Sequence, residues 1–193
     1  KIDMINKTVL TISAETTPNP ETIKFLINRE FDLTSAVNFT NAEEAAGSPM
    51  AKQLFGMGDI IGVMIGKSFI AITKQESASW ENLAGKCVST IQSVFDSTDN
   101  PLGTNLPESH VNSLEDDQNP IIIKIKSILD TEIRPAVAMD GGDIVFHSYA
   151  DGIVKLRLQG ACSSCPSSIM TLKMGVENRL KSLIPEIKEV EQV

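Results

Sequence analysis

The stretch that decides the fold of the second half of the chain is DIVFHSYADGIVKLRLQGACSSCPSS, residues 143–168. Two runs rich in apolar and β-branched residues flank Ala150, Asp151 and Gly152, and an Asp-Gly pair between such runs is a strong hairpin signal. The second run leads into a loop with two cysteines, after which a proline suits the first turn of a helix. The stretch therefore predicts two antiparallel strands and a CxxC loop at the start of a helix.

Helical patterns lie on both sides of this hairpin. Before it, Asn119 can cap a helix that begins at Pro120, and Pro135 is expected to end that helix near Arg134. After it, apolar residues keep helical spacing over residues 166–184. The tail, residues 186–193, spaces its apolar side chains by three, which by itself does not predict a strand.

The first half of the chain predicts the element order β-β-α-β-β-α, with strong turn signals between the strands. A Thr-Pro-Asn-Pro turn separates the first two strands, and Gly66-Lys67 suits a tight hairpin between the next two. The strands are expected at residues 8–15, 21–28, 59–65 and 68–74, and the helices at residues 47–57 and 79–95.

The segment between the two halves has the composition of a flexible linker. Residues 97–119 carry five acidic and no basic side chains, and they show no apolar periodicity. We therefore predict an α+β protein of two small domains, residues 1–96 and 120–193, joined by an acidic linker at residues 97–119.

Composition excludes several classes of protein. The net charge is −8 and no basic stripe is present, which argues against a nucleic-acid partner. No apolar run approaches the ~20 residues of a membrane-spanning helix. Three cysteines, an odd number, and an N-terminal stretch unlike a secretory signal predict a reducing compartment. We expect a bacterial cytoplasmic protein or, for a trimmed organellar protein, the mitochondrial matrix.

The two cysteines of the loop, Cys162 and Cys165, allow three kinds of chemistry. A thioredoxin-like dithiol needs a CxxC at a helix start within a βαβ unit, and the expected elements provide no such unit after the hairpin. A zinc site needs four ligands, but Cys87 is expected in a buried apolar helix face and His147 on a strand surface. The third reading is half of an iron–sulfur site, because four thiolates could come from two chains. The ligand count alone also allows a transient metal chaperone.

At this point the sequence resembles a known family. The turn Gly141-Gly142-Asp143, the loop GACSSCPS, the terminal KEVEQV and a helix ending in IRP look like the C-terminal domain of NifU, which NifU-like (Nfu) iron–sulfur proteins share. The first half resembles the Nfu N-terminal domain in TPNPETIKF (residues 17–25), in residues 48–74 and in Trp80. The resemblance covers nearly the whole chain except the linker.

The resemblance implies a non-enzymatic scaffold or carrier. Cys162 and Cys165 would bind a labile 4Fe-4S cluster, with 2Fe-2S possible, between two chains that form a homodimer when loaded. The partners would be cluster donors and apo iron–sulfur client proteins. The glycine turn would be structural, and the tail would be a third strand, giving α-β-β-α-β. The alternative function is a thioredoxin-like dithiol redox protein, and the first domain, which lacks reactive residues, is expected to be an interaction module.

Overall fold

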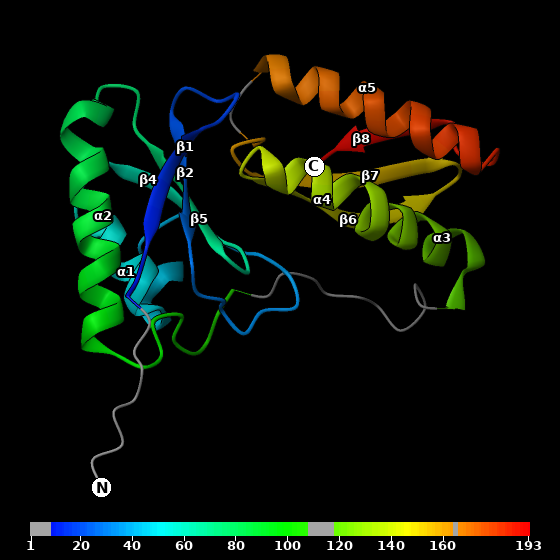
Figure 1. Cartoon of the computed structure of the whole chain (residues 1–193). Helices are drawn as coiled ribbons and strands as arrows, with labels where there is room; N and C mark the ends of the chain where they lie inside the picture. The colour runs from blue at the N-terminus through cyan, green and yellow to red at the C-terminus, as the bar shows by residue number, and fades with distance from the viewer. Residues whose placement is uncertain (1–8, 108–117, 164–165) are drawn as a thin grey trace, which may run out of the picture.

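The computed structural model describes residues 9–107, 118–163 and 166–193, and it is an α+β protein with two sheets (Figure 1). The first sheet has five strands in the order β1-β2-β5-β4-β3, all antiparallel, and the second has three in the order β6-β7-β8. Each sheet has its own hydrophobic core. Within the described part of the chain, no helix has the length and apolar character needed to span a membrane.

Helices cover one face of the first sheet, the face directed away from the second domain (Figure 1). Helix α1 starts where predicted, because the Ser48 side chain accepts a hydrogen bond from the Ala51 N–H and Pro49 occupies the first turn. The elements of this domain are β1 (Ile12–Thr16), β2 (Thr22–Ile27), β3 (Val37–Phe39), a 3-10 turn (Glu44–Gly47), α1 (Pro49–Phe55), β4 (Ile60–Ile65), β5 (Phe69–Lys74) and α2 (Trp80–Ser97).

The predicted order β-β-α-β-β-α lacks one strand, β3. This strand has three residues, too few for alternation of apolar and polar side chains to be recognised in sequence. It exists because it pairs with β4, where Val37 lies opposite Ile65 and Phe39 opposite Val63. Pairing between distant segments, rather than a local pattern, creates this edge of the sheet.

Packing of the first domain continues past Asp96 into the segment predicted as a linker. Helix α2 extends to Ser97, and Leu102 is 8% exposed within the first hydrophobic core. The Met50 N–H also donates to the Pro101 carbonyl at 3.0 Å. The middle of the predicted linker, residues 108–117, lies outside the described residues, and the domain boundaries remain predictions.

The second domain contains the predicted hairpin. Asp151 and Gly152 have φ values of 53° and 88°, so both turn residues adopt the positive φ that a type I′ hairpin turn requires. The hairpin prediction is therefore confirmed. The elements are α3 (Pro120–Ile128), a π turn (Leu129–Ile133), α4 (Arg134–Met139), β6 (Gly142–Ala150), β7 (Ile153–Gly160), α5 (Pro166–Leu183) and β8 (Glu189–Gln192).

The prediction that Pro135 ends the first helix of this domain is wrong. The helix widens into the π turn, in which the Arg134 N–H bonds to the Leu129 carbonyl. Helix α4 then begins at Arg134, with Pro135 in its first turn, where a backbone donor is not needed. The wider turn lets the chain remain helical to Met139.

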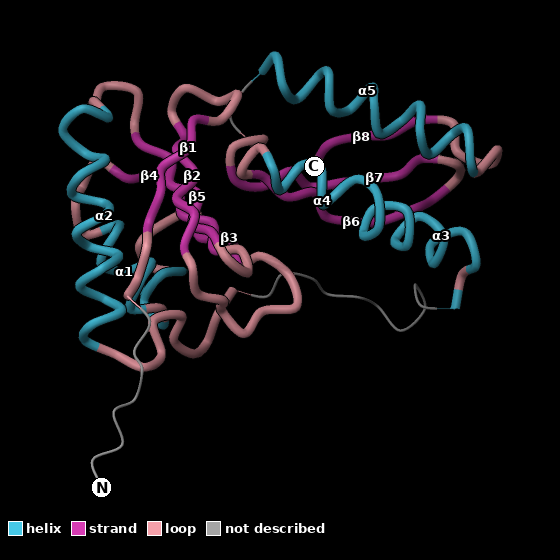
Figure 2. Tube along the Cα trace, in the orientation of Figure 1, coloured by secondary structure: helices cyan, strands magenta, loops and turns pink. Residues whose placement is uncertain are grey.

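The tail forms the third strand that the family resemblance implied. Strand β8 pairs in parallel with β7, so β7, α5 and β8 form a βαβ unit (Figure 2). Our expectation that no βαβ unit follows the hairpin is therefore wrong. The spacing of three between apolar residues did not predict this strand, because only two of the three are buried. Ile187 and Val190 are buried, while Val193 is 47% exposed.

Candidate functional site

Cys162 lies in the loop between β7 and α5. It contacts Gly142, the first residue of β6, which follows the Gly141 turn. The Cys162 residue is 7% exposed and contributes to the second hydrophobic core. A Cβ atom added to Gly142 would lie 2.4 Å from the Cys162 Sγ and 3.1 Å from its Cβ. Only a residue without a side chain fits at position 142, so this glycine creates the space that the thiol occupies.

Two further glycines hold the cysteine loop close to the turn between α4 and β6. Gly141 and Gly160 have φ values of 74° and 63°, in the left-handed region that favours glycine. The Ala161 N–H donates to the Gly141 carbonyl at 3.0 Å, and the Ser163 N–H donates to the Gly160 carbonyl at 3.1 Å. Backbone hydrogen bonds therefore fix the residues on both sides of Cys162.

Asp143 anchors the glycine turn to the helix beside it. Its two carboxylate oxygens accept hydrogen bonds from the Arg134 Nε at 2.8 Å and Nη2 at 2.9 Å, the bidentate geometry of a strong ion pair. The hydrogen bond to Asp143 is the largest cause of the raised pKa of Arg134. A second hydrogen bond, to Asp130, raises this pKa further. Asp143 thus has a structural role, as expected for the Gly-Gly-Asp turn.

A pocket of about 520 Å³ opens beside the Cys162 side chain. One wall is Ile133 and Val137 from the π turn and α4, and a second wall is Leu172 from α5. The third wall is the turn at Pro18 and Asn19, which belongs to the first domain. The lining of this pocket is mainly apolar.

The structure describes one of the two predicted ligands, Cys162, and neither Cys87 nor His147, which the zinc hypothesis would need, joins it. Cys165 lies outside the described residues. Cys87 is fully buried in the first core, and burial raises its thiol pKa to about 12. His147 is exposed on β6, where the strand register shifts. Within residues 9–107, 118–163 and 166–193, no group of three or more His, Cys, Asp or Glu side chains could hold a metal ion.

One residue of the site was missed in the sequence. The Asn19 side-chain amide donates to the carbonyl of Ala161, the residue before Cys162, at 3.1 Å, and Asn19 is 3% exposed. The Thr-Pro-Asn-Pro segment was interpreted only as a turn between strands. Its place in the stretch TPNPETIKF, on which the family resemblance partly rests, was the available signal.

Family models match both halves of the chain. Residues 12–98 match the model described as "Scaffold protein Nfu/NifU N terminal", and residues 125–191 match that of the "NifU-like domain". A solution NMR structure of a NifU-like protein from Saccharomyces cerevisiae is 21% identical, with a TM-score of 0.46, and covers 51% of this chain and 89% of its own.

Curated relatives match over nearly the whole chain. The "NFU1 iron-sulfur cluster scaffold homolog, mitochondrial" of Drosophila sechellia is 45% identical over 94% of this chain and 64% of its own length. The protein of the same description from Drosophila persimilis is 43% identical over 100% of this chain and 68% of its own length. The chain thus spans about two thirds of the length of these relatives.

Proposed function

Because the chain belongs to the NifU-like (Nfu) family of iron–sulfur cluster scaffolds, we propose that it carries a labile 4Fe-4S cluster between two copies and transfers it to apo-proteins. The cluster is cargo rather than a resident cofactor. Cys162 and Cys165 of each copy are the ligands, so that two copies supply the four thiolates that such a cluster usually takes. A 2Fe-2S cluster satisfies the same ligand count.

The observation that carries this proposal is the position of Cys162 in a backbone cradle with an incomplete ligand set. Gly142 leaves space for the thiol, while Ala161 and Ser163 are held by backbone hydrogen bonds on either side. Among the described residues, Cys162 belongs to no group of three or more His, Cys, Asp or Glu side chains that could hold a metal ion. Thiolates from a second copy complete the set, and a cluster held by two loops leaves when the copies separate.

The proposed role requires partners but no catalysis of covalent chemistry by the chain. The partners are a cluster donor and apo iron–sulfur client proteins, and the loaded form is a homodimer. The relatives from Drosophila are described as mitochondrial, which favours the organellar location over the bacterial cytoplasm. We propose the mitochondrial matrix as the site of action.

Anaerobic reconstitution with iron and sulfide tests the carrier function. Native mass spectrometry of the wild-type chain should then give a dimer with about four irons and four sulfides. The matched variants are Cys162→Ser with Cys165→Ser, which should lose the cluster and the dimer, and Cys87→Ser, which should keep both. Equal iron content in the double variant and the wild type would disprove the ligand assignment.

A dithiol redox function is the second candidate, favoured by the βαβ unit. The CxxC segment connects β7 to α5, and β8 follows in parallel, which is the arrangement in which redox-active dithiols occur. This function predicts turnover of a disulfide substrate by the monomer without iron. Absence of turnover with insulin and glutathione disulfide, in a chain that takes up a cluster, would exclude it.

A further inference from the structure

The second domain covers the face of the first sheet that the helices leave bare. Lys24, Ala71 and Met64 stand opposite one another on the neighbouring strands β2, β5 and β4, so their side chains share one face of the sheet. Their exposed fractions are 8%, 1% and 0%. The core beneath α1 and α2 contains other residues of these strands, such as Phe25, so a different part of the molecule buries this row.

Gly141 and Gly160, on either side of the Cys162 loop, pack closely against the row formed by Lys24, Ala71 and Met64. A Cβ atom added to Gly160 would lie 2.9 Å from the Met64 Sδ, and one added to Gly141 would lie 3.5 Å from the Lys24 Cβ and 3.6 Å from the Ala71 Cβ. Figure 2 shows the loops at this end of the second sheet lying next to the first sheet. The same glycines that bring the cysteine loop together therefore also let the two domains approach closely.

Two side chains of the first domain make polar contacts across this boundary. The Lys24 Nζ donates to the carbonyls of Ala138 at 2.9 Å and Met139 at 3.1 Å. These are terminal carbonyls of α4 and lie at the negative end of the helix dipole, and that of Ala138 also accepts from the Gly141 N–H at 3.1 Å. The Asn19 amide donates to the Ala161 carbonyl at 3.1 Å, next to the ligand residue.

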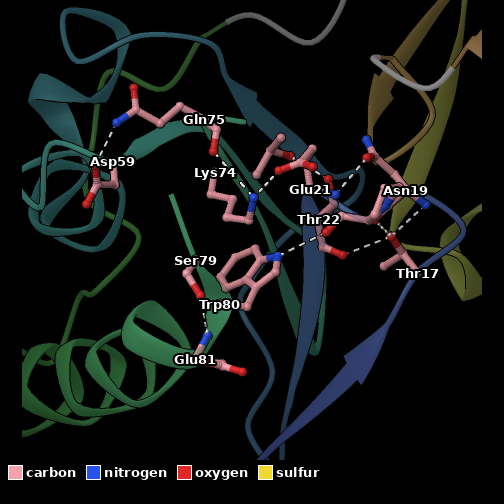
Figure 3. A network of polar contacts seen from close by, with 12 residues as sticks. Thr17, Asn19, Glu21, Thr22, Asp59, Lys74, Gln75, Ser79, Trp80 and Glu81 are labelled. Atoms are coloured by element: carbon pink, nitrogen blue, oxygen red, sulfur yellow. Dashed lines mark hydrogen bonds and ion pairs between the residues drawn. The ribbon is translucent and has the colours of Figure 1, made fainter. Parts of the chain in front are cut away.

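The turn that carries Asn19 is held rigidly by its own domain (Figure 3). The Thr17 hydroxyl donates to the Asn19 carbonyl at 2.9 Å, and the Glu21 N–H donates to the Asn19 Oδ1 at 3.0 Å. The Trp80 indole N–H, at the head of α2, donates to the Pro20 carbonyl at 3.1 Å. Because the side-chain oxygen of Asn19 serves its own turn, its amide group is directed to the second domain.

We propose that the first domain is a cap that closes over the cysteine loop, with Asn19 and Lys24 as its latch. In the closed chain, Cys162 is 7% exposed and the Asn19 turn forms one wall of its pocket. A cluster shared with a second copy must reach Cys162, and the Asn19 turn stands on one side of that approach. The cap therefore shields the Cys162 thiol of the unloaded chain and must open before the Cys162 residues of two copies can meet. This step rests on the proposed carrier function, but closure itself does not.

Alkylation of Cys162 by iodoacetamide in the full chain without iron tests closure. Asn19→Asp keeps the acceptor for the Glu21 N–H and removes the donor to Ala161, and Lys24→Met keeps the apolar stem and removes the donor to α4. With three hydrogen bonds lost, the double variant should be alkylated at Cys162 at least about tenfold faster than the wild type, as resolved by peptide mass mapping. Its radius of gyration in X-ray scattering should also increase.

The matched control is Asn28→Asp with Lys86→Met, which makes the same chemical and charge changes within the first domain. The Asn28 amide donates to the Val9 carbonyl and the Lys86 side chain is exposed on α2, so neither touches the second domain. This control and Lys24→Arg, which retains a cationic donor, should keep the wild-type rate. If the double variant fails to fold by circular dichroism, Lys24→Met alone provides the test.

Equal alkylation rates in wild type, latch variant and control would overturn the cap. A second outcome also rejects the proposal, namely faster alkylation of the latch variant together with equal rates of cluster uptake in latch variant and wild type. The first domain would then cover Cys162 without controlling cluster loading. If the latch variant opens while neither chain binds iron, closure is supported and the carrier function fails. Faster alkylation and faster cluster uptake together support both.

Discussion

Two cysteines, Cys87 and Cys162, are both buried, but one lies inside a domain core and the other in a loop between the two domains. Cys87 is 0% exposed on α2, surrounded by side chains from the sheet and helices of its own domain. Cys162 is 7% exposed in a loop, above a glycine turn and beside the Asn19 turn of the other domain. To expose Cys87 the first core must unfold, whereas Cys162 lies in a loop and is exposed by the proposed opening of the cap. Similar exposed fractions thus conceal very different free energies of exposure.

The largest expected effect concerns the reactivity of Cys87. Burial raises its pKa from 9.0 to about 12, so at any pH below 9 its thiolate fraction is about a thousandfold lower than that of an ordinary thiol. We expect iodoacetamide at pH 8 to leave Cys87 unmodified in the native chain and to modify it rapidly in urea, as measured by peptide mapping.

The same shift predicts a dependence of stability on pH. Because the folded-state pKa is the higher one, the contribution of Cys87 to stability is complete below pH 9 and declines as the pH rises from 9 toward 12. The Cys87→Ala variant should lack this part of the alkaline loss in urea titrations. Alkylation of Cys87 in the native chain as fast as that of Cys162 would contradict the comparison.

The second effect concerns the cradle of Cys162. Gly142→Ala places a methyl group 2.4 Å from the Cys162 Sγ, a contact that forces the loop to shift. We expect the free energy of unfolding to fall by about 2 kcal/mol, the usual cost of overpacking, and cluster binding to be lost with it. Urea titration and iron analysis measure the two effects.

Gly85→Ala is the control for this variant. Gly85 lies on α2 with no atom within 4 Å of the added methyl group, so this variant should be more stable by up to about 1 kcal/mol. A Gly142→Ala chain that loads as well as wild type would show that the cradle is not needed for the site.

The smallest effect concerns β8, the parallel edge strand that has no counterpart in the all-antiparallel first sheet. The Glu177 Oε2 accepts a hydrogen bond from the Val190 N–H at 3.0 Å, and its Oε1 accepts one from the Lys181 Nζ at 2.5 Å. The hydrogen bond from Lys181, followed by that from Val190, lowers the pKa of Glu177 below its ordinary value of 4.5. The contribution of the Glu177 carboxylate to the free energy of unfolding is complete above pH 4.5. It is lost as the pH falls through the lowered pKa.

Glu177→Gln should remove this pH dependence while keeping an acceptor for Val190. We expect hydrogen exchange of β8 to accelerate below pH 4.5 in wild type and less so in the variant, with a stability difference below about 1 kcal/mol. Exchange in the first domain should be the same in both chains. An identical acid response of β8 in the two chains would refute the role of Glu177.

Local signals in the sequence predicted much of the second domain because each needs only neighbouring residues. Asp151 and Gly152 define the hairpin because they can adopt positive φ, and Pro166 marks the helix start behind the CxxC motif. Pro135 was misleading because its effect depends on whether the preceding turn can widen. The short strand β3 and the parallel strand β8 escaped local reasoning because each is defined by its partner strand.

The sequence by itself determined the class of fold, the loop with Cys162 and Cys165, and the family, since these follow from short patterns and their spacing. Only the tertiary structure decided what surrounds Cys162. The glycine cradle needs strands β6 and β7 in register, and the Asn19 contact joins residues 142 positions apart. Such contacts depend on how folded surfaces fit together, a property that no local stretch of sequence encodes.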